Sequence, residues 1–356
     1  MKSLDSRFGV ECRLHWLEFV RFLSALAVLF WHYQHFFYSD IGRPDGFDPE
    51  VMPLYSIFSW LYDYGYWGVQ VFWCLSGYVF YWKYAADISG RGIGFSRFFI
   101  YRFSRLYPLH FLTLIFVGIG QLFFFKETGH YFVYGNNDFE MLLKHLFLAG
   151  SWFGDADSFN GPIWSVSVEL LVYFVFFFLV FLFGNVLFSL FVGIFSGCLF
   201  WFLNVKHPVV GCLFFFFLGG WAWFFSFRLD FVYVRWLCGI ALFLLVGVWI
   251  SSGWALVGSK GYLFFVVALP CILVLFSKLS VGDFWAGMFD FFGSLTYSSY
   301  LLHFPLQLIF VLFGFDFFKS TYFFLFYFGF LFFISFVFYR FYELPAQRLI
   351  RKTFAY

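Results

Sequence analysis

The sequence predicts an all-α protein, a polytopic membrane bundle of about ten transmembrane helices with its amino terminus in the cytoplasm. Two observations predict this fold class. Of the 356 residues, 63% are hydrophobic and only 12% are charged, whereas about 25% of the residues of a soluble domain are charged. The apolar residues also form long runs, and a run of about 20 can cross the hydrocarbon core of a bilayer as a helix.

Ten apolar runs have the length of a membrane span. The first contains Arg21 and is not followed by a small-x-small cleavage site, so it is interpreted as a retained helix and not as a signal peptide. A further run over 139–153 is too polar to cross and is expected to lie at the membrane interface. The predicted spans cover residues 16–37, 66–84, 107–125, 163–183, 185–203, 208–226, 232–250, 261–277, 288–311 and 321–342.

The basic residues predict the orientation of these spans. Cytoplasmic loops of membrane proteins are enriched in lysine and arginine. With ten spans and the amino terminus inside, most of the 22 basic residues fall on the cytoplasmic side. The longest polar stretches, 38–65 and 126–162, then lie outside as loops. Residues 1–356 are expected to form a single membrane domain with no fused soluble domain, so any chemistry must use the spans and their ends.

The composition also argues against several other classes of protein. A net charge of +2 without a basic run gives no indication of nucleic-acid binding. The six cysteines show no paired metal-ligand spacing, and most of them lie in apolar runs. Neither structural disulfides nor a metal site is therefore expected.

The first span carries three ionisable residues that require an explanation. A charged side chain inside the bilayer is costly and by default marks a functional path. His32 follows Arg21 by about three helical turns, so the two side chains share a face and stand about 16 Å apart along the axis. Glu18 precedes Arg21 by one turn and can form an ion pair with it. The alternatives are an arginine that reaches the inner interface and an interfacial histidine, but the shared face favours a functional role.

The second span contains the sequence GVQVFWCLSGYVF, from Gly68 to Phe80. Small residues such as Ser76 and Gly77 allow another helix to approach closely within a membrane. Helix packing is the favoured interpretation of this motif.

An arginine cluster precedes the third span. Arg102 and Arg105 are three residues apart and share one face of a helix, with Arg97 close by. Pro108 follows and is expected at the start of the span, where proline is tolerated. The guanidinium fork binds phosphate well, but cytoplasmic arginines also act as a topology signal. Both interpretations remain open for this cluster.

The fourth span begins with the sequence NGPIWSVSVELLVYF, from Asn160 to Phe174. Ser165 lies in its first turn, and Glu169 lies one turn deeper in otherwise apolar surroundings. A carboxylate at this depth needs a partner from another helix. A functional role is favoured for Glu169.

A polar stripe follows one face of the ninth span. Tyr297, Tyr300 and His303 recur at intervals of three residues, so their side chains lie along the same side of a helix. Pro305 follows and lacks a backbone N–H group, which can open the helix locally.

The last motif, YRFYELPAQ, ends the tenth predicted span. Glu343 and Pro345 are expected to terminate the helix, with Arg340 about one turn earlier.

Together these six motifs resemble the acyltransferase-3 family of integral membrane O-acyltransferases. They occur in the family's order between Glu18 and Pro345, which is nearly the whole chain. The matching patterns are an arginine and a histidine separated by ten residues, Leu-Ser-Gly-aromatic in the second span, Arg-x-x-Arg-x-x-Pro, Trp-Ser-x-x-x-Glu, Ser-x-x-x-x-x-Tyr-Leu-x-His and Glu-x-Pro.

The resemblance implies transfer of an acyl group, usually acetyl, from cytoplasmic acyl-CoA to a hydroxyl group of an extracytoplasmic glycan. Such a glycan is an exopolysaccharide, a capsule or a lipopolysaccharide, free or lipid-linked, and the enzyme lies in the bacterial inner membrane. Acyl-CoA is then a co-substrate, and no bound cofactor is expected. By the same resemblance His32 is catalytic, and Arg102 and Arg105 bind the donor. A separate periplasmic acyltransferase could complete the transfer.

Physical chemistry suggests roles for the remaining motif residues. His32 suits a general base, and Glu169 would fix its tautomer or stabilise its charged form. Tyr300 or His303 would donate to the developing oxyanion. The donor-binding residues are expected to be Arg21, Arg97, Arg102 and Arg105. The supporting residues are expected to be Glu18, Ser76, Ser165, Tyr300, His303 and Glu343.

Two other functions fit part of the sequence. Acyl transfer to a lipid or a small metabolite would use the same motifs, and the acyl group could be succinyl or longer. A multispan transporter without covalent chemistry would also explain charged residues within spans. The transporter interpretation is disfavoured because no pair of broken spans in two related halves is visible in the sequence.

Overall fold

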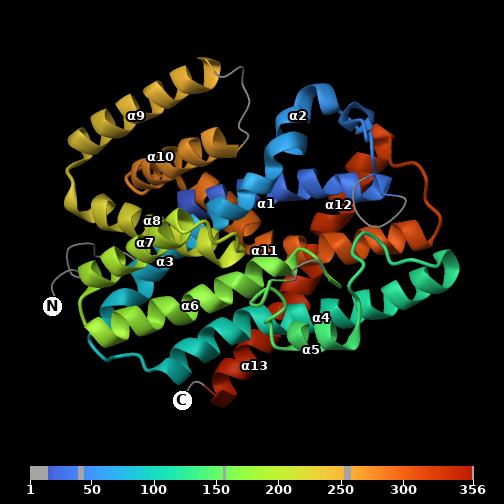
Figure 1. Cartoon of the computed structure of the whole chain (residues 1–356), viewed down its shortest axis with the longest axis horizontal. Coiled ribbons are helices and arrows are strands. Elements are labelled where there is room, and N and C mark those ends of the chain that lie inside the picture. The colour runs from blue at the N-terminus through green and yellow to red at the C-terminus, as the bar shows by residue number, and fades with distance from the viewer. Residues whose placement is uncertain (1–14, 39–43, 155–157, 252–257, 355–356) are drawn as a thin grey trace.

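The computed structural model of the chain describes residues 15–38, 44–154, 158–251 and 258–354, and every regular element within these ranges is a helix. Many of its long helices lie roughly alongside one another (Figure 1). The α-helices are α1 (His15–His32), α2 (Tyr55–Tyr64), α3 (Gly68–Ser89), α4 (Phe95–Thr128), α5 (Phe139–Leu146), α6 (Ile163–Phe183), α7 (Val186–Phe202), α8 (Pro208–Arg228), α9 (Phe231–Ser251), α10 (Gly258–Phe276), α11 (Asp283–Leu312), α12 (Thr321–Phe338) and α13 (Leu344–Phe354). The shorter elements are η2 (Tyr33–Phe37), η3 (Pro49–Val51), η4 (Gly65–Trp67) and the π-helix η5 (Tyr339–Glu343).

Each apolar run that the sequence predicts as a span overlaps one of these helices, and the run over 139–153 contains only the short helix α5. By length and composition, five helical stretches could cross a membrane: Phe95–Thr128, Ile163–Phe183, Pro208–Arg228, Asp283–Leu312 and Thr321–Phe354. The shorter apolar helices are Val186–Phe202, Val232–Phe243 and Gly261–Phe276. The helical fold class is therefore confirmed, while ten spans and a cytoplasmic amino terminus stay predictions. The residues before His15, which contribute to the predicted orientation, lie outside the described ranges.

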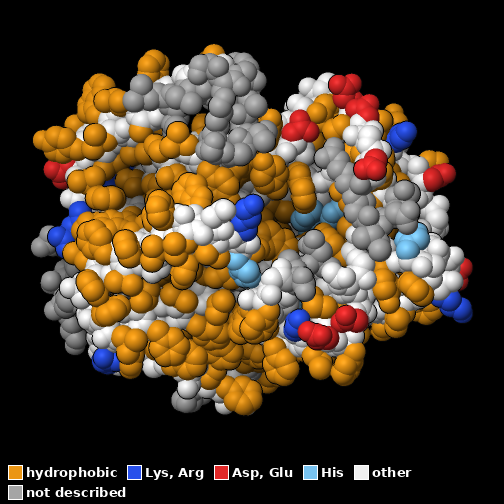
Figure 2. Space-filling model, viewed as in Figure 1, with side chains coloured by type: hydrophobic (Ala, Val, Ile, Leu, Met, Phe, Trp, Pro, Cys, Tyr) orange, Lys and Arg blue, Asp and Glu red, His pale blue; other side chains and the backbone are white. Residues whose placement is uncertain are grey.

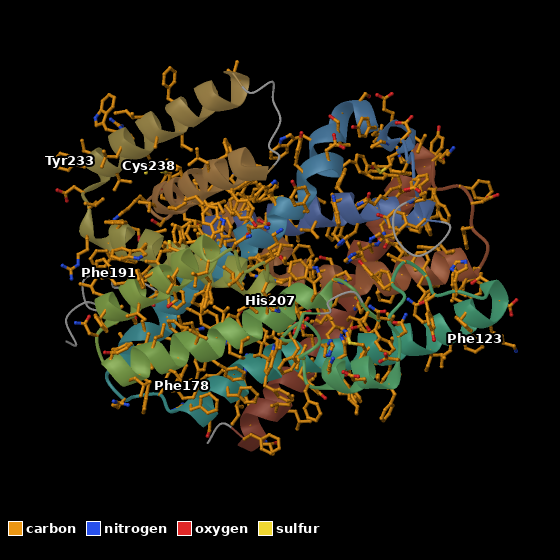
Figure 3. All side chains as sticks on the ribbon, in the orientation of Figure 1. Phe123, Phe178, Phe191, His207, Tyr233 and Cys238 are labelled. Carbon is orange, nitrogen blue, oxygen red and sulfur yellow. The ribbon has the colours of Figure 1, made fainter. Side chains whose placement is uncertain are left out.

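The surface of the bundle is strongly apolar. Hydrophobic side chains cover much of the face drawn in Figure 2, and charged side chains are few and scattered on it. Phe123, Phe178 and Phe191 lie at the periphery in Figure 3, and each is about half exposed or more. An aromatic side chain exposed in this way is costly in water but favourable in contact with lipid.

Two residues fix the boundary between α6 and α7. Gly184 ends α6 in the left-handed region, with φ of 59°, which costs little only for a residue without a Cβ atom. The side chain of Asn185 then caps α7, because its Oδ1 atom accepts a hydrogen bond of 3.2 Å from the Phe188 N–H group.

The structure corrects two helix boundaries. α4 begins at Phe95, so the arginine cluster is helical and Pro108 lies inside the helix and not at its start. The tenth predicted span does not end at Glu343, because the chain continues through the π-helix into α13. Pro345 cannot donate the hydrogen bond of a regular helix, and a π turn accommodates the resulting break.

Among the described residues, α3 and α8 form the most extensive contact between two helices. A Cβ atom placed on Gly77 would lie 1.7 Å from the Phe216 carbonyl oxygen, and one on Gly219 would lie 1.8 Å from that of Cys74. The backbones therefore touch at these two positions, which confirms the packing role predicted for Gly77. α1 and α11 are also close, since a Cβ atom on Gly293 would lie 2.5 Å from the Glu18 carboxylate.

Candidate active site

A cavity of about 460 Å³ lies between α1, α3, α4, α6 and α11. Most of the residues that the sequence nominates for the site line it. They are Glu18, Arg21, Ser76, Arg102, Arg105, Ser165, Glu169 and Tyr300. These nominated residues come from five of the six motifs, and Tyr339 of the sixth motif lines the cavity as well. Lys83, Tyr173 and Tyr339 also line the cavity and were not predicted.

Glu18 and Arg21 form an ion pair at the wall of the cavity. The Arg21 Nη1 atom lies 2.8 Å and 2.7 Å from the two carboxylate oxygens of Glu18. This confirms the pairing expected from their spacing on the helix. The adjacent Gly293 on α11 leaves the space that the Glu18 side chain occupies.

Arg102 is held by aromatic rings. Its guanidinium carbon lies 4.8 Å from the ring centroid of Phe80 and 5.0 Å from that of Tyr84, and its Nη2 atom donates to the Tyr84 hydroxyl. Contacts of this kind stabilise a guanidinium group without neutralising its charge. The Arg102 Nε–H group is buried and has no hydrogen-bond partner among the described residues. It is a donor that an anionic ligand could use.

Arg105 lies in a different electrostatic environment. Its guanidinium is attracted by the carboxylates of Glu343 and Glu18. Glu343 is 1% exposed and accepts hydrogen bonds from Ser298 Oγ at 2.7 Å and Gln347 Nε2 at 3.0 Å. Glu343 is thus placed behind the cavity wall as the counter-charge of Arg105. A buried carboxylate of this kind depends on its cation for stability.

Arg97 and Arg351 flank the arginines of the cavity. Arg97 is exposed, is not among the lining residues, and donates to the Tyr101 hydroxyl at 3.0 Å. Arg351 on α13 donates to Ser104 Oγ at 2.9 Å, and the charges of Arg102 and Arg105 repel it. The sequence shows Arg351 only as one more basic residue near the predicted cytoplasmic end, because nothing in it shows that α13 returns to α4.

Glu169 has partners on other helices, as its depth in an apolar span requires, and one partner a turn later on α6 itself. Its carboxylate forms hydrogen bonds with the hydroxyl groups of Ser76 and Tyr173, and the charges of Arg102 and Arg21 attract it. These contacts place it within the cavity, among the charged residues.

A second cluster lies beyond the end of the cavity and contains His32, His35 and His303, which are all buried. The Nδ1 atom of His32 lies 2.9 Å from the Nε2 atom of His303. Gln307 completes the cluster, because its Nε2 atom donates to the His32 carbonyl oxygen at 2.9 Å and its Oε1 atom lies 3.3 Å from the His35 Nδ1 atom. Among the described residues no group of three or more His, Cys, Asp or Glu side chains could hold a metal ion.

Tyr300 connects the cavity to the histidine cluster. Its hydroxyl group, at the cavity, lies 2.8 Å from Ser165 Oγ and donates to the Pro162 carbonyl oxygen at 2.9 Å. Its own carbonyl oxygen lies 2.7 Å from the His303 Nδ1 atom. Tyr300 thus separates the histidine cluster from the cavity and contacts both.

His35 and Gln307 are the members of the cluster that the sequence reasoning missed. Gln307 follows His303 by four residues in an apolar span, and this spacing extends the polar stripe of the ninth span. His35 reads from sequence as an interfacial histidine, but it is 2% exposed. Only the packing of η2 against α11 shows its position.

Comparison with known proteins identifies the family to which the chain belongs. A family model described as an acyltransferase domain matches residues 14–340. A curated relative, acyltransferase MdmB of Streptomyces mycarofaciens, is 32% identical over 111 residues, which make up 30% of this chain. The match spans only about a quarter of that relative, 26% of its length. No solved structure shows a significant match.

Proposed function

The chain belongs to the acyltransferase-3 family of integral membrane proteins, and from this premise we propose that it is an O-acyltransferase. The proposed donor is cytoplasmic acyl-CoA, with acetyl as the acyl group, and the proposed acceptor is a hydroxyl group of an extracytoplasmic glycan. The proposed location is the bacterial inner membrane, with the amino terminus in the cytoplasm. The observation that carries the proposal is a single cavity that extends from a charged wall to the tyrosine beside a histidine pair.

The arginine end of the cavity suits the donor. CoA carries several phosphate groups, and charge-assisted hydrogen bonds from guanidinium groups are the strong contacts that hold such anions. Arg102 offers a buried N–H group without a partner among the described residues. Arg351 adds a second cation close to it. Arg105, with the carboxylate of Glu343 as its counter-charge, supports the wall of the site.

The opposite end suits the chemistry. A thioester arm that lies along the cavity would bring its acyl carbon to Tyr300 and Ser165. His32, behind Tyr300, would remove the proton from the acceptor hydroxyl as the oxygen attacks the acyl carbon. The Tyr300 hydroxyl would support the developing oxyanion, after its proton turns away from the Pro162 carbonyl oxygen. Glu169 would balance the positive charge of Arg21 and Arg102 while the arm is bound.

The proposal is tested by following the acyl group. Membranes that contain the wild-type protein are incubated with CoA carrying a labelled acetyl group, and label is measured in the polysaccharide, lipid and small-molecule fractions. We expect label in polysaccharide, and none above background with His32→Ala at a matched protein level. Label that enters the lipid or small-molecule fraction instead would refute the glycan acceptor. Absence of transfer to every fraction would refute acetyl transfer.

Donor binding gives a separate prediction. Removal of the Arg102 side chain deletes a charge-assisted contact, which is worth about 1.5–3 kcal/mol. Arg102→Ala should therefore raise the KM for acyl-CoA by roughly 10-fold to 150-fold while the protein remains folded. Arg351→Ala should act in the same direction but less strongly, because its guanidinium is already bonded to Ser104 and Gln347.

The matched control for these two variants is Arg228→Ala. Arg228 also rests on an aromatic ring, with its guanidinium 5.3 Å from the centroid of Phe224, but it lies at the end of α8 and outside the cavity. Its KM for acyl-CoA should equal that of the wild type. An unchanged KM in both Arg102→Ala and Arg351→Ala would show that these arginines act only in topology or packing.

A further inference from the structure

The hydrogen bonds around His303 determine which ring nitrogens carry protons. The His303 Nδ1 atom lies 2.7 Å from the Tyr300 carbonyl oxygen, which can only accept, so this nitrogen carries a proton. A neutral imidazole has one donor and one acceptor nitrogen, and the His303 Nε2 atom is therefore an acceptor. The His32 Nδ1 atom lies 2.9 Å from it and must donate. The remaining nitrogen, Nε2 of His32, is left with a free lone pair.

The surrounding contacts hold the two rings in this arrangement. The planes of the His32 and His303 rings are only 11° apart, with their centroids at 4.9 Å, as expected for an in-plane hydrogen bond between two imidazoles. Gln307 fixes the backbone of His32, because its side-chain amide donates to the His32 carbonyl oxygen. The Tyr327 hydroxyl donates to the His303 carbonyl oxygen at 3.3 Å. His303 itself is fully buried, so water does not compete for its ring nitrogens.

Proline and asparagine keep the α11 backbone in position beside the pair. Pro305 lacks the N–H group that would bond to the Leu301 carbonyl oxygen in a regular helix. Asn160 replaces it, because its Nδ2 atom donates to that oxygen at 3.0 Å. The segment before α6 therefore supplies the missing hydrogen bond, and the turn that carries both Tyr300 and His303 stays helical.

We propose that His303 is a positioning residue that fixes His32 as a base with its Nε2 atom unprotonated. This inference rests on the proposed function. The chain Tyr300 carbonyl, His303, His32 has the logic of a catalytic triad, in which a third group orients the base and sets its tautomer. It also replaces the oxyanion role that the sequence suggested for His303, since both of its ring nitrogens are engaged.

The reaction step balances with this arrangement. The acceptor oxygen forms a bond to the acyl carbon, and the hydroxyl proton moves to Nε2 of His32. The lone pair of His303 Nε2 stabilises the resulting imidazolium through the Nδ1–H group of His32. Collapse of the tetrahedral intermediate breaks the carbon–sulfur bond, and the proton passes from His32 to the CoA thiolate. His303 neither gains nor loses a proton in this cycle.

Two variants of His303 separate positioning from packing. His303→Leu removes the acceptor, whereas His303→Gln retains an amide oxygen that can accept from the His32 Nδ1–H group. We expect His303→Leu to lower kcat by about 10²–10⁴-fold with the KM for acyl-CoA unchanged. His303→Gln should recover at least about tenfold of that loss. If the two variants lose activity equally, or if His303→Leu retains wild-type kcat, the positioning role is refuted.

The matched control is His110→Leu. His110 is likewise fully buried and has a carbonyl acceptor, that of His145, at 2.7 Å, but it lies on α4 away from the pair. It should reproduce any general cost of removing a buried histidine while kcat stays near the wild-type value. A loss as large as that of His303→Leu would assign the effect to packing.

A spectroscopic readout tests the tautomer without activity. Nitrogen-15 NMR of the purified protein labelled at histidine distinguishes protonated from unprotonated ring nitrogens, and the His32 signals are assigned by their loss in His32→Gln. We expect a protonated Nδ1 and an unprotonated Nε2 in the wild type, and a mixture in His303→Leu. The opposite tautomer in the wild type would refute this inference while leaving the proposed function in place. Full transfer activity in His32→Gln would instead refute the general base of the proposed function.

Discussion

Replacement of His32 by glutamine is expected to abolish acyl transfer in a protein that still folds and binds CoA. Glutamine retains hydrogen-bonding capacity and similar bulk, but it cannot take up a proton near neutral pH. Loss of a general base costs about 10²–10⁴-fold in rate, and loss of a nucleophile could cost more. The measurement is the rate of acyl transfer to the native acceptor in membranes, at protein levels matched by immunoblot, together with CoA binding to the purified protein.

The control for this variant is His130→Gln. His130 lies in the segment between α4 and α5, outside the cavity and the histidine cluster, and its substitution should leave the rate unchanged. Near wild-type transfer by His32→Gln would show that the histidine is structural. The base would then have to be sought at Glu169, which lies inside the cavity.

Substitution of Gly77 by alanine is expected to prevent normal assembly of the bundle. The added methyl group would lie 1.7 Å from the Phe216 carbonyl oxygen and 2.6 Å from its carbon. Overpacking of a core typically costs about 1–3 kcal/mol. Here the cost should exceed that range, because the obstacle is the backbone of α8 and no side chain can turn away. The measurement is the thermal unfolding temperature in detergent and the yield of monodisperse protein.

Gly211→Ala provides the matched control on the same pair of helices. A Cβ atom at Gly211 on α8 would meet only the Trp73 ring of α3, at 3.5 Å, which is an ordinary contact. Because alanine also favours a helix over glycine by about 0.5–1 kcal/mol, this variant should be as stable as the wild type or slightly more so. Equal stability of the two variants would show that the α3–α8 contact is looser than the structure indicates.

The helical segments could be predicted from the sequence because their signal is local. An apolar run of sufficient length forms a helix in lipid whatever its neighbours are, since backbone groups must be satisfied within the segment. The run over 163–183 coincides with α6, from Ile163 to Phe183. The pairing of Glu18 with Arg21 was predictable for the same reason, because both residues lie on one helix turn.

The boundary errors arose where a local rule met a tertiary contact. Proline usually starts or ends a helix, and this rule predicts helix boundaries at Pro108 and Pro345. In the structure α4 continues through Pro108, although the ring leaves the Ser104 carbonyl oxygen without its helical donor. Tyr297 of α11 and Tyr342 of the π-helix donate to the Leu106 and Pro108 carbonyl oxygens, so tertiary contacts hold the chain at the proline.

The candidate site itself divides in the same way. The helices, the acyltransferase motifs and the unusual residues within them can be read from the sequence, because these depend on composition and on spacings of a few residues. Three pairings depend on how the helices assemble: His32 with His303, 271 positions away, Glu343 with Arg105, and Arg351 with the arginine cluster. Helical periodicity fixes which face of its helix a residue occupies. Its partner depends on which helices meet, and backbone contacts such as that at Gly77 decide this.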